Sequence, residues 1–240
     1  MSAPVTYHFA DGVATITIDD GKANALSFAM LAAIGEALDR ADADGAIVIL
    51  NGRPGIFSGG FDLNVMRAGG NDTALLVEEG FVLGIRLLEY PAPVIIGCTG
   101  HAVAMGAFLL LCGDYRVGVD GPFRIVANEV AIGMTMPFTA IEFCRQRLTP
   151  AAVNRAVILA EPFSPADACA AGFLDRVVGV EDLVPTTASL ASAVGGLNRA
   201  AHTATKGRVR VDAIKAIREA LEHDRASFAT LIASPPSTRN

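Results

Sequence analysis

The sequence predicts an α/β fold that ends in a helical region. Short apolar runs typical of buried strands alternate with segments of helical periodicity through most of the chain. After residue 184 the strand-like runs stop, and amphipathic helical spacing continues over 206–232. The 240 residues are 52% hydrophobic with a mean hydropathy of +0.43, which allows a large buried core. We therefore expect a core over residues 1–184 and a helical C-terminal region over residues 185–240.

The individual elements follow from local signals. Two alternating runs, 5–10 and 13–18, flank Asp11-Gly12 and predict a hairpin. Ser27 is a suitable N-cap for a helix over 28–41. The other expected strands cover 46–50, 93–98, 114–117 and 174–178, with a short strand and turn over 123–133. The other expected helices cover 72–89, 107–111, 137–147, 150–160 and a segment that starts at 164. The glycine-containing segments 51–63 and 100–106 are expected to be loops.

Charge and composition exclude several classes of protein. The formal net charge of −6 argues against a nucleic-acid partner. No apolar run approaches the length of about 18 residues that spans a membrane, and the first residues lack the features of a signal peptide, so we expect a cytoplasmic protein. The four cysteines have no zinc-site spacing and are expected to be small buried side chains, at Cys98, Cys112, Cys144 and Cys169.

Two glycine-containing segments, 57–63 and 100–108, each lie between a predicted strand and a predicted helix. Glycines let a backbone approach a ligand closely, and the N–H groups at a helix start face negative charge. Two such segments could converge on one oxygen and form an oxyanion hole. The alternatives are an ordinary strand-to-helix turn for the first and close helix packing for the second. Neither segment has the spacing of a P-loop or of a dinucleotide-binding loop.

Glu129 lies within the otherwise apolar segment 126–133. A carboxylate in apolar surroundings is seldom buried without a role, and desolvation raises its pKa toward the range of a general base. The alternative is a glutamate whose head reaches solvent or a salt bridge. Glu129 is therefore the candidate proton-transferring group.

In this order, the three segments resemble the crotonase family, the enoyl-CoA hydratase and isomerase superfamily. The likeness covers most of the chain, and the matching pieces are the opening hairpin, Asn24-Ala25-Leu26, 57–63, 100–114, the Glu129 segment, Arg147-Leu148 and 164–172. The resemblance implies a spiral of ββα units followed by a C-terminal helical trimerisation region, assembled into a homotrimer or a hexamer. It also implies an enzyme of fatty-acid β-oxidation type that acts on an acyl-CoA thioester and needs no cofactor.

The resemblance assigns roles to individual residues. It implies that the backbone N–H groups of Phe61 and Met105 form the oxyanion hole and that Glu129 is the catalytic base. Many relatives have Ala and Gly at the two donor positions, so the larger side chains here are expected to reshape the thioester pocket. The residues expected to contact substrate or CoA are Lys22, Ala23, Ala25, Ser58, Gly60, Asp62, Leu63, Gly106 and Phe108. Lys22 and Arg53 are candidates for the CoA phosphates, with a solvated surface charge as the alternative.

Phe108 is the main departure from the hydratase pattern. Hydratases of the family carry two glutamates that hold and activate water, and one of them falls at Phe108 here. A single base and an oxyanion hole suffice to move a proton from C2 to C4 of a 3-enoyl-CoA. The motifs around Cys112–Arg116 and Asn128-Glu129 are similar to the single-glutamate Δ3,Δ2-enoyl-CoA isomerases. We therefore expect an isomerase.

Three other functions remain open at this point. A hydratase would need a substitute carboxylate, for which Glu78, Glu79 and Glu142 are the candidates. A non-catalytic acyl-CoA-binding trimer would keep the fold for assembly alone. A hydrolase has little support, because Ser58 and His101 lack a recognisable triad context.

Overall fold

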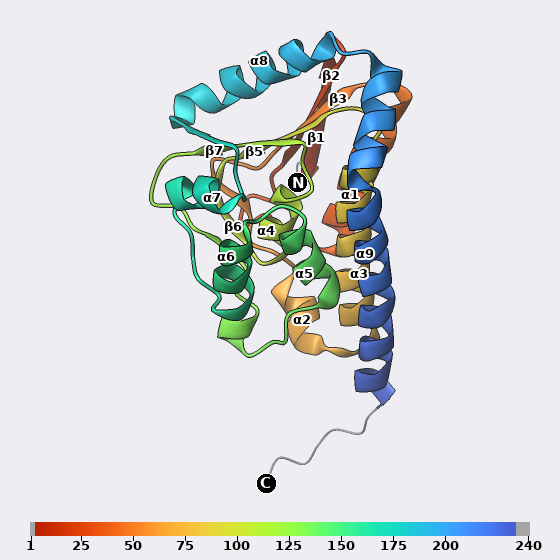
Figure 1. The fold of residues 1–240 in the computed structure, drawn as a ribbon. Helices are drawn as coiled ribbons and strands as arrows, with labels where there is room; N and C mark the ends of the chain where they lie inside the picture. The colour runs from red at the N-terminus through yellow and green to blue at the C-terminus, as the bar shows by residue number, and fades with distance from the viewer. Residues whose placement is uncertain (1–2, 234–240) are drawn as a thin grey trace.

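The computed structural model describes residues 3–233 and contains two β-sheets surrounded by helices (Figure 1). The larger sheet has six strands in the order β1-β2-β3-β5-β7-β9. Its strands are β1 (Val5–Ala10), β2 (Val13–Ile18), β3 (Ile47–Asn51), β5 (Val94–Cys98), β7 (Tyr115–Val119) and β9 (Arg176–Val178). All neighbouring strands are parallel except the first pair. The predicted α/β class with a mainly parallel core is confirmed.

The only antiparallel pair of this sheet is the predicted hairpin. Its turn residues Asp11 and Gly12 have φ angles of 51° and 77°, both in the left-handed region. Two consecutive positive φ angles characterise the two-residue turn whose twist matches a hairpin, and Asp-Gly tolerates them well. The hairpin therefore forms for the local reason that the sequence suggested.

The smaller sheet contains β4 (Gly55–Ser58), β6 (Gly100–Val103) and β8 (Ile125–Val126), all parallel. Segments 51–63 and 100–106 were expected to be loops, so that part of the prediction is wrong at β4 and β6. Glycines explain the difference, because a Cβ on Gly100 would collide with the backbone of Gly55 in the paired strand. Gly100 therefore lets two strands pair closely, whereas the glycines of this segment predict a loop from the sequence alone.

The helices agree with the prediction more closely at their starts than at their ends. Ser27 caps α1 as expected, since its hydroxyl accepts from the Met30 N–H at 3.2 Å. The helices are α1 (Phe28–Ala43), α2 (Leu63–Ala68), α3 (Gly70–Glu89), α4 (Met105–Leu110), α5 (Phe138–Arg145), α6 (Pro150–Val153), α7 (Pro165–Ala171), α8 (Leu183–Gly195) and α9 (Arg199–Ala233). The helix expected over 150–160 is α6 followed by a π-helical turn, Asn154–Ile158. Helix α2 was not predicted.

The C-terminal helices cover two different faces of the molecule (Figure 1). Helix α8 lies across β3, β5 and β7, whereas α9 runs along α3 and α5. The expected boundary at residue 184 falls inside α8. One large apolar cluster joins the sheet to α1, α3, α4 and α5 and includes Ile217 and Leu221 of α9. Helix α9 is thus packed onto the core of its own chain.

Within residues 3–233, no helix combines the length and the apolarity that a bilayer crossing requires.

Candidate active site

Asn24 joins two of the predicted substrate-binding segments. Its φ angle of 50° turns the chain sharply after β2, and its side chain is fully buried. The side-chain amide donates to the carbonyl of Phe57 at 3.1 Å, and the Asn24 carbonyl accepts from the Ser58 hydroxyl at 2.8 Å. The Gly59 N–H also donates to the carbonyl of Ala23 at 2.8 Å. Segments 22–26 and 57–60 therefore lie side by side, as a shared binding surface requires.

Gly60 brings the third segment to the same place. Its φ angle is 88°, and a Cβ at this position would lie 2.9 Å from the carbonyl oxygen of Val103, 3.0 Å from the Cβ of Ala104 and 3.5 Å from the nitrogen of Met105. A larger residue would thus be excluded by both backbone conformation and space. The segments that carry Phe61 and Met105 meet at this glycine, because Gly60 directly precedes Phe61.

The two proposed oxyanion donors are free to bind a ligand. Met105 is the first residue of α4, so its N–H has no carbonyl partner within the helix. Leu26 forms a parallel β-bridge with Phe61, in which the Leu26 N–H donates to the Gly60 carbonyl and the Asp62 N–H donates to the Leu26 carbonyl. The N–H of Phe61 itself takes no part in this bridge. Among residues 3–233, no hydrogen bond from either donor is found. That both N–H groups bind one thioester oxygen stays a prediction.

The side chains of Phe61 and Met105 pack against α3 at Gly80. A Cβ on Gly80 would overlap the Phe61 ring and would lie 3.6 Å from the Cγ of Met105. The Phe61 ring also meets Phe81 edge-on, with centroids 6.5 Å apart. The absence of a side chain at Gly80 therefore makes room for the side chains of Phe61 and Met105.

Glu129 is buried, with 7% of its surface exposed, where the chain leaves β8. Its carbonyl accepts from the Met134 N–H at 2.8 Å, which closes a turn around the 3₁₀ segment Val130–Ile132. The Oε2 atom is buried, and no hydrogen-bond partner or ion pair is found for it in the described part of the chain. Within residues 3–233 the alternative of a salt-bridged glutamate therefore finds no support, and little of the residue reaches solvent.

Burial shifts the acidity of this carboxyl. Desolvation raises the pKa of Glu129 from 4.5 to about 7, and its own backbone N–H offsets part of the rise. Burial also raises the pKa of the Cys144 thiol on α5, and the Glu129 charge raises it further, which places the carboxylate near the inner face of that helix. A carboxylate with these properties can exchange a proton near neutral pH.

The sequence of the chain matches a known protein family. The model for enoyl-CoA hydratase/isomerase matches residues 8–237. The chain belongs to the enoyl-CoA hydratase/isomerase family. This confirms the resemblance to the crotonases, and the fold agrees with that of solved members.

Individual relatives carry more than one activity in their names. An enoyl-CoA hydratase/isomerase family protein from Pseudomonas syringae is 49% identical with a TM-score of 0.92, covering 94% of this chain and 98% of that one. A Mycobacterium tuberculosis protein, named an enoyl-CoA isomerase in one solved structure and a probable enoyl-CoA hydratase in another, is 46% identical in the first structure with a TM-score of 0.90, covering 94% of this chain and 99% of that one. Human mitochondrial enoyl-CoA delta isomerase 1 is 29% identical over 186 residues, which are 74% of this chain but only 61% of the human protein. Other matches are named enoyl-CoA hydratases.

Phe108, at which the resemblance places one of the two hydratase glutamates, lies in α4 and is buried in the main apolar cluster. A phenyl ring can neither accept a proton nor orient water. Two of the three candidate substitutes are engaged elsewhere, since Glu78 pairs with Arg225 and Glu142 pairs with Arg145. For Glu79, which is half-buried on α3, no ion pair is found among residues 3–233.

The remaining predicted contact residues divide into structural and open positions. The buried Ser58 hydroxyl accepts from the Gly60 N–H at 3.2 Å and supports the loop, as does Gly106, whose Cβ would overlap the Ser58 carbonyl. Asp62 caps α2 by accepting from the Asn64 N–H, while Leu63 is exposed. Roles in substrate binding for these residues stay predictions.

The two candidate phosphate-binding cations differ in their surroundings. Lys22 is exposed, and no hydrogen bond from its ammonium is found within residues 3–233. Arg53 instead donates to the Lys22 carbonyl at 2.8 Å and pairs with Asp19 at 3.3 Å. Lys22 is thus the better placed of the two to meet an anionic ligand.

Sequence reasoning missed the part that Asn24 and Gly80 play in shaping the site. No local pattern marks these contacts, because Phe57 lies 33 residues from Asn24 in the chain and Phe61 lies 19 residues from Gly80. Among residues 3–233, no three His, Cys, Asp or Glu side chains are grouped in a way that could hold a metal ion.

Proposed function

We propose that this chain is a Δ3,Δ2-enoyl-CoA isomerase of fatty-acid β-oxidation type. The observation that carries the proposal is the buried carboxylate of Glu129, which has a pKa of about 7 and an unpaired oxygen. The buried phenyl ring of Phe108, at which the resemblance implies a second glutamate in hydratases, supports it. The catalytic cycle then uses one base for both proton transfers and requires no cofactor. The isomerase name of the human relative supports it.

The reaction follows from the groups available. The thioester oxygen of a 3-enoyl-CoA accepts from the Phe61 and Met105 N–H groups, and the Glu129 carboxylate removes a proton from C2. The electron pair of that C–H bond forms a dienolate whose negative oxygen the two N–H groups stabilise. Glu129 then returns the proton to C4 while the double bond settles between C2 and C3. Loss of one such oxyanion donor typically lowers the rate by about 100- to 1000-fold.

A hydratase is the second candidate, because several relatives carry that name. Addition of water across a 2-enoyl-CoA needs a group that holds and deprotonates water while another protonates C2. Glu129 could perform only one of these tasks at a time, and Phe108 can perform neither. A non-catalytic acyl-CoA-binding trimer has less support, because an unpaired buried carboxylate costs stability and a scaffold has no use for it. A cytoplasmic homotrimer or hexamer completes the proposal.

The test compares two substrates and two variants. Purified protein is assayed with 3-hexenoyl-CoA and with crotonyl-CoA, beside Glu129→Gln and the control Glu142→Gln, which alters an arginine-paired carboxylate on α5. We expect turnover of the first substrate, little hydration of the second, and a loss of about 100- to 10,000-fold in Glu129→Gln alone. Isomerase turnover that persists in Glu129→Gln would overturn the assignment. Comparable hydration of crotonyl-CoA would establish the hydratase instead.

A further inference from the structure

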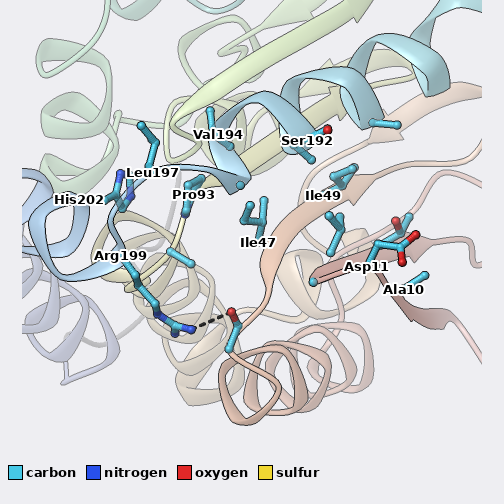
Figure 2. Close-up of a pocket in the computed structure, with 18 of the residues that line it drawn as sticks. Ala10, Asp11, Ile47, Ile49, Pro93, Ser192, Val194, Leu197, Arg199 and His202 are labelled. Carbon is cyan, nitrogen blue, oxygen red and sulfur yellow. Dashed lines mark hydrogen bonds between the residues drawn. The ribbon is translucent and has the colours of Figure 1, made fainter.

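Two cavities adjoin at the junction of α8 and α9, away from Glu129. The first cavity, of about 640 Å³, lies between α8 and strands β1, β2 and β3 of the large sheet. Figure 2 shows Leu197 and His202 at the end of this cavity near α9. Its lining is largely apolar, and Arg199 at its rim is already bound to the Gly45 carbonyl at 2.7 Å. The second cavity, of about 430 Å³, shares Leu197 and His202 but is lined by three further cations.

Among residues 3–233, Asp114 is the only carboxylate that lines the second cavity, and both of its oxygens are occupied. Lys206 from α9 approaches one oxygen at 2.7 Å, and Arg210 approaches the other at 2.9 Å. The Val94 N–H also donates to Asp114 at 2.7 Å. The side chains of Lys206 and Arg210 are only 7% and 12% exposed. The single negative charge of Asp114 balances only one of these two positive charges.

A second carboxylate, Asp175, lies behind this pair. Its carboxylate accepts two hydrogen bonds from the Arg116 guanidinium, at 2.6 and 2.8 Å. The Arg147 guanidinium lies farther away, at 3.8 Å. The four cations Arg116, Arg147, Lys206 and Arg210 therefore face two carboxylates, which leaves an excess of two positive charges. Such an excess is costly in a poorly solvated place unless an anion offsets it.

Several nitrogen atoms of the cluster also lack partners. The Nη1 atom of Arg116, the Nε atom of Arg147 and the Nε2 atom of His202 are buried, and no hydrogen-bond partner is found for them within residues 3–233. The Arg116 side chain is only 3% exposed. Burial lowers the pKa of Arg147 and of Lys206, and the neighbouring arginines lower both further. The carboxylates of Asp175 and Asp114 oppose these two shifts only in part.

We propose that this cluster binds a small oxyanion of the phosphate type. The Nη2 atom of Arg147 donates to the Asp114 carbonyl at 3.3 Å, and the rest of its guanidinium can donate to such an anion, while Lys206 and Arg210 add charge. The site is separate from the proposed acyl-CoA site, because Asp114 and Val94 stand at the starts of β7 and β5, whereas 100–106 follows the end of β5. Starts and ends of parallel strands lie at opposite edges of a sheet.

Binding is measured with inorganic phosphate by calorimetric titration and by thermal unfolding, against sodium chloride at matched ionic strength. The variants are Arg147→Gln and the control Arg145→Gln, an exposed arginine two residues away that pairs with Glu142. We expect phosphate to raise the unfolding temperature of the native chain beyond the chloride effect. Arg147→Gln should weaken phosphate binding at least tenfold, and Arg145→Gln should leave it unchanged.

A further variant guards against a folding defect. Arg147→Lys keeps the positive charge but loses the planar fork, so it should fold and bind phosphate several-fold more weakly. The proposal is overturned if phosphate raises the unfolding temperature no more than chloride does. It is also overturned if the native chain and both Arg147 variants bind phosphate with equal affinity. Isomerase assays are independent of this result, since the two sites lie at opposite edges of the sheet.

Discussion

At the scale of the residue, the burial of Glu129 predicts how activity depends on pH. The base must be ionised to remove a proton, and its pKa is about 7. The kcat/KM for 3-hexenoyl-CoA should therefore rise about tenfold per pH unit below pH 7 and become constant above it. A pH profile from about pH 5.5 to 9 measures this. A profile that is already flat at about pH 5.5 would show that the base has the pKa of an ordinary solvated glutamate.

The same group predicts a pH-dependent stability. The folded state holds the Glu129 proton more tightly than the unfolded chain does, because the pKa rises from 4.5 to about 7 on folding. This contribution to stability is complete below pH 4.5 and is lost as the pH rises through 7. Glu129→Gln, which is neutral throughout, should therefore exceed the native chain in unfolding free energy by about 2–3 kcal/mol at pH 8 and match it near pH 4.5.

Denaturant unfolding at the two pH values measures this difference, with Glu142→Gln as the control because its carboxylate is paired at the surface. Equal gains at both pH values would contradict the prediction, since they would indicate a packing effect without a titration. A stabilised Glu129→Gln that is inactive would show that the site trades stability for chemistry.

At the scale of the element, α5 depends on a cap supplied by α9. Asp224 is buried and accepts from the Phe138 N–H at 2.9 Å and from the Thr139 N–H at 2.8 Å, the first two residues of α5. Asp224→Ala leaves these donors unpaired and should lower the unfolding free energy by about 1–3 kcal/mol. Denaturant unfolding checks this, and Glu219→Ala, exposed on the same helix, should change it by less than about 0.5 kcal/mol. A similar loss in both variants would contradict the capping role.

The elements that the sequence predicted well are those that local physics decides. The hairpin, α1 and the buried strands each carry a turn, a cap or an apolar run that acts within a few residues. Strands β4 and β6 were missed because their pairing rests on Gly55 and Gly100, which come close only after the chain has returned across 45 residues. The π-helical turn after α6 was missed for a similar reason, since its apolar spacing resembles that of an ordinary helix.

The site was predictable in its parts but not in its assembly. Glu129 stood out as a charge among apolar neighbours, and its burial follows from that pattern. Nothing local indicated that Asn24 would fasten segment 22–26 to segment 57–60, or that Gly60 would contact Ala104. The resemblance to a known family supplied that arrangement. The charge cluster around Asp114 escaped notice because its members lie up to 96 residues apart.

At the scale of the whole molecule, α9 links regions that the sequence suggested were separate. It contributes Ile217 and Leu221 to the main apolar cluster and supplies Lys206 and Arg210 to Asp114 beside the large sheet. A helix tied to the core at several points along its length cannot unfold without exposing that core. The helical C-terminal region and the spiral core should therefore unfold together.

Differential scanning calorimetry of the native chain should show one transition, with the same midpoint for secondary and tertiary structure by circular dichroism. Asp114→Asn should shift this whole transition downward, because it leaves buried cations without their partner. Removing one partner of a buried pair costs about 3–5 kcal/mol, which for a chain of this size is roughly 6–20 °C. Asp212→Asn, exposed on α9, should cause no shift. Two resolved transitions, with only the lower one moved by Asp114→Asn, would instead make 185–240 an independent unit.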